Sequence, residues 1–140
     1  MSIIHPSLPG ARVLDLFAGS GALGLEAVSR GAAHADLVER AAPSLRAMST
    51  NIEILGAAEQ VTVHRVDAMR FISALRAHDY DVAFADPPYD LGLATAIAEA
   101  WLATPFAALI GNEHRIHECL PPGGDTRKYG GTGITFYRIG

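Results

Sequence analysis

Stretches typical of strands alternate with stretches typical of helices along nearly the whole chain, and this alternation constrains the fold more than any other feature. The expected strands comprise residues 12–18, 34–40, 61–66, 80–85, 106–114 and 133–139. The expected helices comprise residues 21–30, 43–55, 68–76 and 94–102. Strands that alternate with helices form a parallel sheet covered by helices on both faces. The sequence therefore predicts an α/β fold of the doubly wound type.

The length of the chain suits one domain of this kind. Its 140 residues, 49% hydrophobic and 19% charged, are typical of a single globular domain, so we assign residues 1–140 to one domain. A glycine-rich segment, residues 123–133, joins the last two expected strands, and Gly130-Gly131 precede the closing strand. Such a connection predicts an antiparallel hairpin at one edge of the sheet.

The first expected strand runs directly into a glycine-rich turn, VLDLFAGSGALG (residues 13–24). This turn fits the G-x-G-x-x-G pattern of a dinucleotide site, and Glu39 lies close to where a ribose-binding carboxylate would follow. Asp15, however, lies within the strand, four residues before Gly19. A buried carboxylate is costly without a cation or donors, and it would repel a pyrophosphate. S-adenosylmethionine, which carries an ammonium and a sulfonium but no phosphate, therefore fits better than NAD.

Further carboxylates follow the ends of the other expected strands. Because the carboxyl ends of parallel strands meet at one edge, we expect Asp15, Glu39, Asp67 and Asp86 to lie together there. Glu39 can accept hydrogen bonds from ribose hydroxyls, and Asp67 from an adenine amino group while Ala68 supplies a backbone donor. Each has a structural alternative: an internal cap for Asp15, a solvated strand end for Glu39, and a helix N-cap for Asp67.

The stretch FADPPYD (residues 84–90) directly follows the fourth expected strand. Its two prolines remove two N–H donors and stiffen the turn. The Asp86 carboxylate and the Pro87 carbonyl can then accept from one exocyclic amino group, which directs the nitrogen lone pair at a methyl donor. Tyr89 offers a ring on which a flipped-out base can stack. The alternative, a plain turn, needs neither the acid nor the aromatic residue.

These motifs together resemble one protein family. Residues 15–32, DLFAGSGALGLEAVSRGA, with LVER, DPPY and RKYGGTGITFY, are similar to the bacterial 16S rRNA guanine-N2 methyltransferases of the RsmD type. That family belongs to the class I S-adenosylmethionine-dependent methyltransferases. The resemblance spans residues 10–137. Its first motif is specific to the family, whereas DPPY also occurs in adenine-N6 DNA methylases. The resemblance implies a Rossmann-like, mostly parallel seven-stranded sheet with a C-terminal antiparallel hairpin.

The resemblance also implies an activity and a set of site residues. The activity is methyl transfer from S-adenosylmethionine to an exocyclic base nitrogen, guanine N2 of 16S rRNA, with 16S rRNA or the small ribosomal subunit as partner. The catalytic residues would be Asp86, Pro87, Pro88 and Tyr89. The cofactor pocket would be lined by Asp15, Phe17, Ala18, Gly19, Ser20, Gly21, Glu39, Arg40, Asp67, Ala68 and Asp86. Two alternatives remain: an adenine-N6 DNA methylase, and a cofactor-binding domain without RNA methylation activity. We expect a monomer.

The front of the chain departs from the family pattern. Family members usually carry several tens of residues before the first strand, with a basic hairpin thought to grip RNA, whereas twelve residues precede Val13 here. The stretch MSIIHPSLPG resembles the tail of the missing segment. We hypothesise that the N-terminal RNA-binding arm is absent. The net charge of −4 agrees with this, because it gives the chain no overall attraction for phosphate backbones.

The remaining candidate features predict less. EHRIHEC (residues 113–119) lacks the four-ligand spacing of zinc sites, so we expect no metal. Arg127, Lys128 and Tyr129 form the only basic and aromatic cluster, which suits either a nucleic-acid contact or a solvated hairpin. The single cysteine, Cys119, indicates a reducing cytoplasm, and no apolar run reaches 18 residues, so we expect no membrane insertion.

Overall fold

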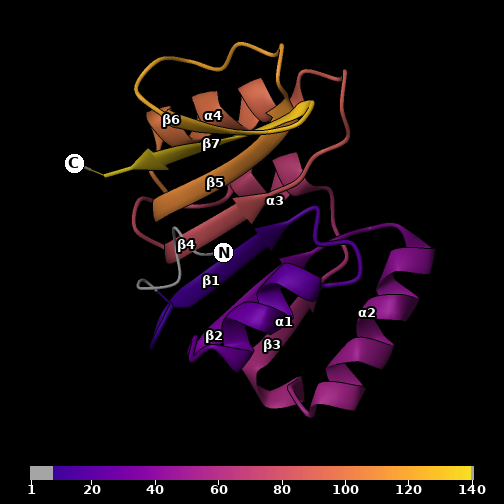
Figure 1. The fold of residues 1–140 in the computed structure, drawn as a ribbon. Coiled ribbons are helices and arrows are strands. Elements are labelled where there is room, and N and C mark those ends of the chain that lie inside the picture. Colours follow the sequence, from indigo (N-terminus) through magenta and orange to yellow (C-terminus); the bar gives the residue numbers. More distant parts are fainter. Residues whose placement is uncertain (1–7, 140) are drawn as a thin grey trace.

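The computed structural model describes residues 8–139, which form a seven-stranded sheet flanked by helices (Figure 1). The strands are β1 (Arg12–Leu16), β2 (His34–Val38), β3 (Val61–His64), β4 (Tyr80–Ala85), β5 (Ala107–Arg115), β6 (Asp125–Tyr129) and β7 (Thr132–Arg138). The helices are α1 (Ala22–Ser29), α2 (Ala42–Leu55), α3 (Ala68–Ser73) and α4 (Leu93–Ala103), with a 3₁₀ turn, η2 (Ala58–Gln60). The interpretation of MSIIHPSLPG falls largely outside the described residues.

The strand order is β3-β2-β1-β4-β5-β7-β6. Strands β1 to β5 pair in parallel, whereas β7 is antiparallel to both of its neighbours, β5 and β6. This arrangement confirms the expected mostly parallel sheet with an antiparallel hairpin at its C-terminal edge.

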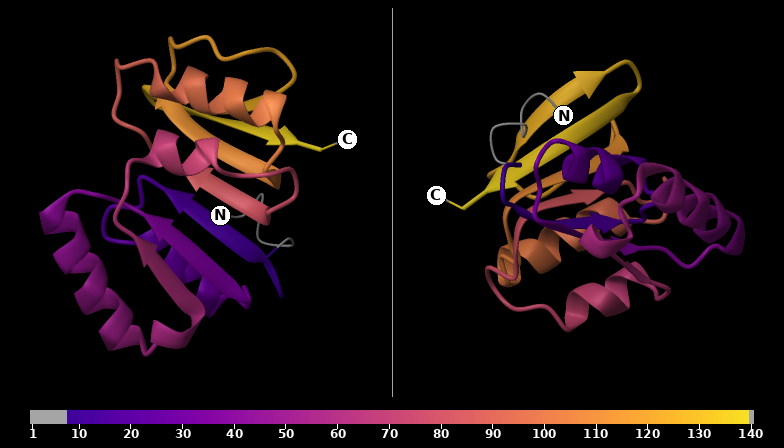
Figure 2. Two further views of the ribbon diagram at one scale, coloured as in Figure 1. Left: turned by 180° about the vertical axis from the view of Figure 1, so that it is seen from behind. Right: turned by 90° about the horizontal axis from the view of Figure 1, so that it is seen from below.

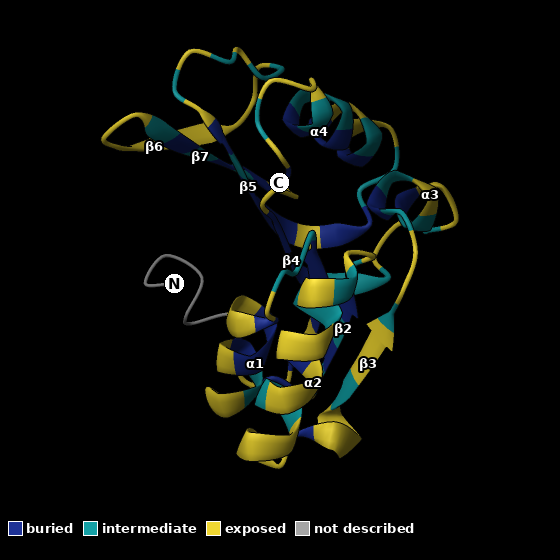
Figure 3. Cartoon of the chain, turned by 90° about the vertical axis from the view of Figure 1, so that its right-hand side faces the viewer, coloured by how far each residue is buried: buried dark blue, intermediate teal, exposed yellow. Residues whose placement is uncertain are grey.

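Successive side chains along each strand point to opposite faces of the sheet, so they pack into two hydrophobic cores, one on each face. Val13 of β1 joins a core with Ala27 of α1 and Met48 of α2, whereas Leu14 joins the core beneath α3 and α4, which includes Ile97. Helices α1 and α2 accordingly cover one face, and α3 and α4 the other (Figure 2). The central strands are buried, while the edge strand β6 is exposed at every position (Figure 3).

Several elements end earlier than the sequence predicts, for local reasons. β1 stops at Leu16 because Phe17 adopts a left-handed conformation with φ 58°. β2 stops at Val38 because the carboxylate of the next residue, Glu39, accepts hydrogen bonds from the backbone that turns into α2. α3 stops at Ser73 rather than residue 76, and Asp79 accepts a hydrogen bond from the Arg76 N–H in the turn that follows.

The expected direct connection between the last two strands is wrong. β5 and β7 do pair antiparallel, but the segment between them contains a further strand, β6, which pairs with the far side of β7. The sequence of β6, DTRKY, has no alternation of apolar residues because all its positions are exposed. The hairpin is therefore β6–β7, closed by Gly130-Gly131, with Gly130 at φ 63°.

Gly24 of α1 offers a test of how closely this helix must pack on the sheet. A Cβ atom at Gly24 would collide with the Leu37 side chain and lie 3.3 Å from Oδ2 of Asp15. Leu37 is fully buried, so its side chain cannot turn away into solvent. We therefore expect Gly24→Ala to lower the free energy of unfolding by about 1–3 kcal/mol, although alanine favours helices.

Urea denaturation followed by circular dichroism measures this change. Gly131→Ala is the matched control, because a Cβ at Gly131 meets nothing within 4 Å. A Gly24→Ala protein as stable as the wild type would show that α1 can move away from β2.

Candidate active site

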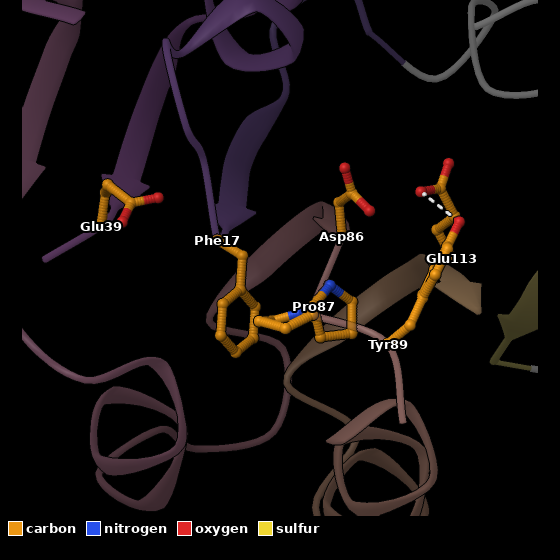
Figure 4. A pocket seen from close by; sticks show the side chains of 7 residues that line it. Phe17, Glu39, Asp86, Pro87, Tyr89 and Glu113 are labelled. Carbon is orange, nitrogen blue, oxygen red and sulfur yellow. Dashed lines mark hydrogen bonds between the residues drawn. The ribbon is translucent and has the colours of Figure 1, made fainter. Parts of the chain in front are cut away.

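Two adjoining hollows lie at the carboxyl ends of the parallel strands, and we name each after one of its residues. The Asp86 hollow, of about 470 Å³, is lined by Phe17, Glu39, Asp86, Pro87, Pro88, Tyr89 and Glu113. The Asp67 hollow, of about 560 Å³, is lined by Phe17, Val38, Glu39, Arg40, Ala41, Asp67, Ala68, Pro88, Leu91 and Leu93. Phe17, Glu39 and Pro88 line both, so the two form one continuous site. Figure 4 shows the side chains of the Asp86 hollow.

The turn after β1 bounds this site and requires its glycines. Gly19 and Gly21 have φ values of 59° and 82°, which side chains rarely tolerate. A Cβ at Gly21 would also lie 3.2 Å from the side chains of Leu37 and Met48. Phe17 has φ 58° without being a glycine, a strained conformation of the kind that collects at functional sites.

Glu39 is held by three backbone donors. Its Oε1 accepts from the Gly19 N–H at 2.9 Å, and its Oε2 accepts from the N–H groups of Arg40 at 3.0 Å and Ala41 at 2.9 Å. Glu39 is therefore more than a solvated strand end, because it ties the glycine turn to the start of α2. The carboxylate oxygens still border both hollows and retain lone pairs for a ligand.

Asp15 lies buried beneath the glycine turn, where its Oδ2 accepts from the Gly24 N–H at 3.0 Å. Burial, with a smaller contribution from the carboxylates of Asp86 and Glu39, raises the pKa of Asp15 to about 7, and the hydrogen bond from Gly24 opposes the rise. Asp15 is absent from the residues that line the two hollows. This geometry matches the structural alternative considered for Asp15, an internal cap. It also places the Asp15 carboxyl beneath the site.

Asp67 performs the capping role that was the alternative to ligand binding, and it still faces the Asp67 hollow. Its Oδ2 accepts from the Arg70 N–H at 3.1 Å at the start of α3. Its Oδ1 lies 3.7 Å from Nη2 of Arg40. Ala68 is buried beside it and lines the same hollow. One carboxylate oxygen therefore fixes the helix, and the other remains next to the hollow.

The Asp-Pro-Pro-Tyr segment continues β4 and forms one wall of the Asp86 hollow. The Tyr89 hydroxyl lies 3.2 Å from Oγ1 of Thr132 and donates to Oε2 of Glu113 at 3.4 Å. The Arg115 guanidinium lies over the Tyr89 ring, with Cζ 4.8 Å from its centroid. Tyr89 is thus oriented by β5 and β7.

Glu113, near the end of β5, is the one charged residue of the hollows that the sequence analysis did not assign to the site; Val38, Ala41, Leu91 and Leu93 are the others it missed. A hydrogen bond to the neighbouring Asp86 carboxylate, followed by burial, raises the pKa of Glu113 to about 7. The signal that could have found it was its position at the carboxyl end of a strand parallel to β4. The stretch EHRIHEC drew attention to metal binding instead.

The structure brings most of the predicted site residues together. Those that line a hollow are Phe17, Glu39, Arg40, Asp67, Ala68, Asp86, Pro87, Pro88 and Tyr89. Ala18, Gly19, Ser20 and Gly21 form the turn beside the hollows, and none of the four lines them. Among residues 8–139, no group of three or more His, Cys, Asp and Glu residues is placed to hold a metal, and no helix is long and apolar enough to cross a membrane.

Apart from Glu113, the residues of EHRIHEC do not line the hollows, and neither does the basic and aromatic cluster of residues 127–129. His114 is buried, with Nε2 2.7 Å from Oγ1 of Thr135, whereas His117 is exposed. Lys128 and Tyr129 are exposed on β6, where Arg127 pairs with Asp125 at 3.1 Å.

Comparisons with known proteins show which family the chain belongs to. The family described as "Conserved hypothetical protein 95" matches residues 1–138. A Bacillus subtilis (strain 168) protein named as a candidate rRNA methyltransferase, YlbH, is 35% identical over 148 residues, which cover 98% of this chain and 80% of that protein. Ribosomal RNA small subunit methyltransferase D of Escherichia coli (strain K12) is 37% identical over 123 residues, which cover 84% of this chain and 60% of that protein. The match thus spans less than two thirds of the Escherichia coli relative.

A solved structure shares the fold. The RNA methyltransferase of Salinibacter ruber, in complex with S-adenosyl-L-homocysteine, has a TM-score of 0.72 at 12% identity, with 99% of this chain and 88% of that chain covered. The sheet order of this chain is accordingly that of the class I methyltransferase fold.

The buried carboxyl of Asp15 gives a testable pH dependence. Its pKa of about 7 lies above the ordinary value near 4, so between these values the folded protein binds a proton that the unfolded chain has lost. The stability contributed by neutral Asp15 is complete below about pH 4 and is lost as pH rises through about 7. Asp15→Asn removes this titration and keeps an oxygen for the Gly24 N–H.

We therefore expect Asp15→Asn to be more stable than wild type at pH 8, by on the order of 2–4 kcal/mol, and to differ little at pH 4. Urea denaturation at a series of pH values measures both. A residual fall in the variant is expected, since the raised pKa of Glu113 acts in the same direction. Parallel curves for the two proteins would contradict the assignment.

Proposed function

Because the chain belongs to the family described as conserved hypothetical protein 95, we propose that it is an RsmD-type methyltransferase that methylates RNA with S-adenosylmethionine as cofactor. The acceptor in this proposal is the exocyclic amino group of guanine, N2, in 16S rRNA. The names of its relatives support an RNA substrate. To this the proposal adds guanine as the target base, 16S rRNA as the target molecule, and a monomeric protein in the cytoplasm.

The observation that carries the proposal is the position of Asp86 and Tyr89 in a hollow that shares Phe17 and Glu39 with its neighbour. The Asp67 hollow suits a nucleoside, and the Asp86 hollow beside it suits a second base. An amine held at Asp86 would therefore lie next to the group that occupies the shared boundary. Proximity of this kind supplies a large part of the rate of a transfer reaction.

The residues present fit S-adenosylmethionine. Carboxylates of Glu39 and Asp67 border the Asp67 hollow, and its one cation, Arg40, faces Asp67. This acidic lining suits a cationic ligand and opposes a pyrophosphate, so it favours S-adenosylmethionine over NAD. Phe17 and Leu91 supply apolar walls for an adenine ring, and Glu39 supplies acceptors for ribose hydroxyls.

The main contribution of the chain to the reaction is to position the acceptor amine. When bound, S-adenosylmethionine supplies an electrophilic methyl carbon on a positively charged sulfur. The Asp86 carboxylate and the Pro87 carbonyl accept the two amino hydrogens and so direct the nitrogen lone pair toward that carbon. Tyr89 packs against the base. Asp86 also stabilises the positive charge that develops on the nitrogen, and it accepts the proton lost after transfer.

Transfer of tritiated methyl groups tests the whole proposal. Unmodified small ribosomal subunits, purified 16S rRNA and DNA are offered with labelled S-adenosylmethionine, and labelled nucleosides are identified by mass spectrometry. We expect N2-methylguanosine in 16S rRNA. Label in DNA adenine would establish the N6 methylase instead, and cofactor binding without transfer to any acceptor would establish a binding domain.

Asp86→Ala separates chemistry from cofactor binding. Removal of the carboxylate leaves the amine without its main acceptor, so we expect kcat to fall at least about a hundredfold. The affinity for S-adenosylmethionine, measured by calorimetry, should stay within about threefold. Asp125→Ala, which removes an exposed carboxylate on β6, is the control with unchanged kcat. Normal turnover of Asp86→Ala would refute the role of Asp86.

Glu39→Gln should have the opposite pattern. The amide loses a charged acceptor at the ribose, so we expect S-adenosylmethionine to bind roughly ten- to a hundredfold more weakly. Once the cofactor is saturating, kcat should change less than about threefold. Because Glu39 also accepts backbone hydrogen bonds, urea denaturation must accompany the calorimetry. Unchanged cofactor affinity in a folded variant would contradict the assignment.

A further inference from the structure

A second carboxylate stands beside Asp86 in the wall of the Asp86 hollow. Ala85 of β4 is paired with Asn112 of β5 in parallel register, so the next residues, Asp86 and Glu113, are neighbours across the two strands. Both line the hollow, and in Figure 4 their carboxyl groups point in the same direction. The proposed methyl transfer uses Asp86 but gives Glu113 no role.

Glu113 is half-buried and is not neutralised by a cation. None of the ion pairs among residues 8–139 includes Glu113. The nearest guanidinium along β5, that of Arg115, is bonded instead to Asp90 at 2.9 Å. The hydroxyl of Tyr89 donates to Oε2 of Glu113 at 3.4 Å. Once Glu113 is ionised and no longer shares a proton with Asp86, its other oxygen can accept from a ligand.

Two adjacent carboxylates repel each other, and a ligand with two adjacent N–H donors relieves that repulsion. The Watson–Crick edge of guanine offers such a pair, the ring N1–H beside the N2 amino group. Adenine offers an amino group beside N1, which is an acceptor. An acceptor that faces another acceptor in a desolvated site leaves both unpaired, at a substantial cost.

Resting on the proposed function, we propose that Glu113 reads the target base by accepting the guanine N1–H while Asp86 holds the N2 amino group. Glu113 then selects guanine over bases whose N1 is an acceptor. Glu113 is a specificity residue in this inference, distinct from Asp86, which serves the reacting nitrogen.

The competing explanation is structural: Glu113 could act only by anchoring the Tyr89 hydroxyl. Tyr89→Phe separates the two, because it removes that hydrogen bond and leaves the carboxylate in place. If Glu113 reads the base, Tyr89→Phe keeps the preference between bases even where it lowers the rate with each.

The test uses short oligouridylates with one central guanine, 2-aminopurine or adenine. 2-Aminopurine keeps the amino group at position 2 but has an acceptor at N1, so it isolates the proposed contact. Methyl transfer gives kcat/KM for each RNA at pH 8, where Glu113 is ionised. In parallel, anisotropy of the labelled RNAs gives their affinities in the presence of S-adenosylhomocysteine.

We expect wild type to favour guanine over 2-aminopurine by roughly ten- to a hundredfold. Glu113→Ala should reduce this ratio to within about threefold of one, mainly by slowing the reaction with guanine. Glu113→Gln should retain part of the ratio, because its amide oxygen still accepts. Glu99→Gln, an exposed change on α4, should leave the ratio and the rate unchanged.

Equal use of guanine and 2-aminopurine by wild type, or an unchanged ratio in Glu113→Ala, would overturn the inference. Loss of the ratio in Tyr89→Phe would also overturn it in favour of the anchoring role. The proposed function is tested separately, by methyl transfer to small ribosomal subunits and 16S rRNA. If none of the three oligonucleotides is methylated, the anisotropy ratios alone test the role of Glu113. In that case, equal binding of the guanine and 2-aminopurine RNAs, or binding of neither, would also overturn the inference.

Discussion

Hydrogen bonds to one carboxylate, that of Glu39, join the segments from which the site is built. Oε1 of Glu39 accepts from the Gly19 N–H after β1, and Oε2 accepts from the N–H groups of Arg40 and Ala41 before α2. These hydrogen bonds hold the turn that includes Phe17, whose φ is 58° and whose side chain lines both hollows. Such a strained conformation persists only where its surroundings determine it, so the contacts of this turn, rather than the local preference of Phe17, set its backbone here.

The same edge gathers carboxylates that destabilise the protein when nothing binds them. Asp86 and Glu39 both contribute to the raised pKa of Asp15, and Asp86 contributes to that of Glu113. The pKa values of Asp15 and Glu113 are thus both about 7, because each carboxyl lies close to like charges and is removed in part from water. The clustered carboxylates lower the folding stability and at the same time make the site favour cations and hydrogen-bond donors, as is common at functional sites.

The sequence predicted elements with clear local limits and missed those set by distant contacts. α2 was found because Pro43 lies in its first turn and Gly56, at φ 62°, follows its last residue. β6 was missed because an exposed edge strand carries no apolar alternation. In the site, the motifs after β1, β2 and β4 could be assigned from adjacent residues. Glu113 could not, since its position beside Asp86 depends on the register between β4 and β5.

The antiparallel end of the sheet, far from the glycine turn in sequence, determines how Tyr89 faces the hollow. Arg115 of β5 covers one face of the Tyr89 ring at 4.8 Å and donates from Nε to Asp90 at 2.9 Å. Thr132 of β7 and Glu113 of β5 hold the hydroxyl of the same ring. Only one ring face is then left for stacking in the proposed reaction. The hairpin and β5 thereby set which face of the Tyr89 ring a base can stack on.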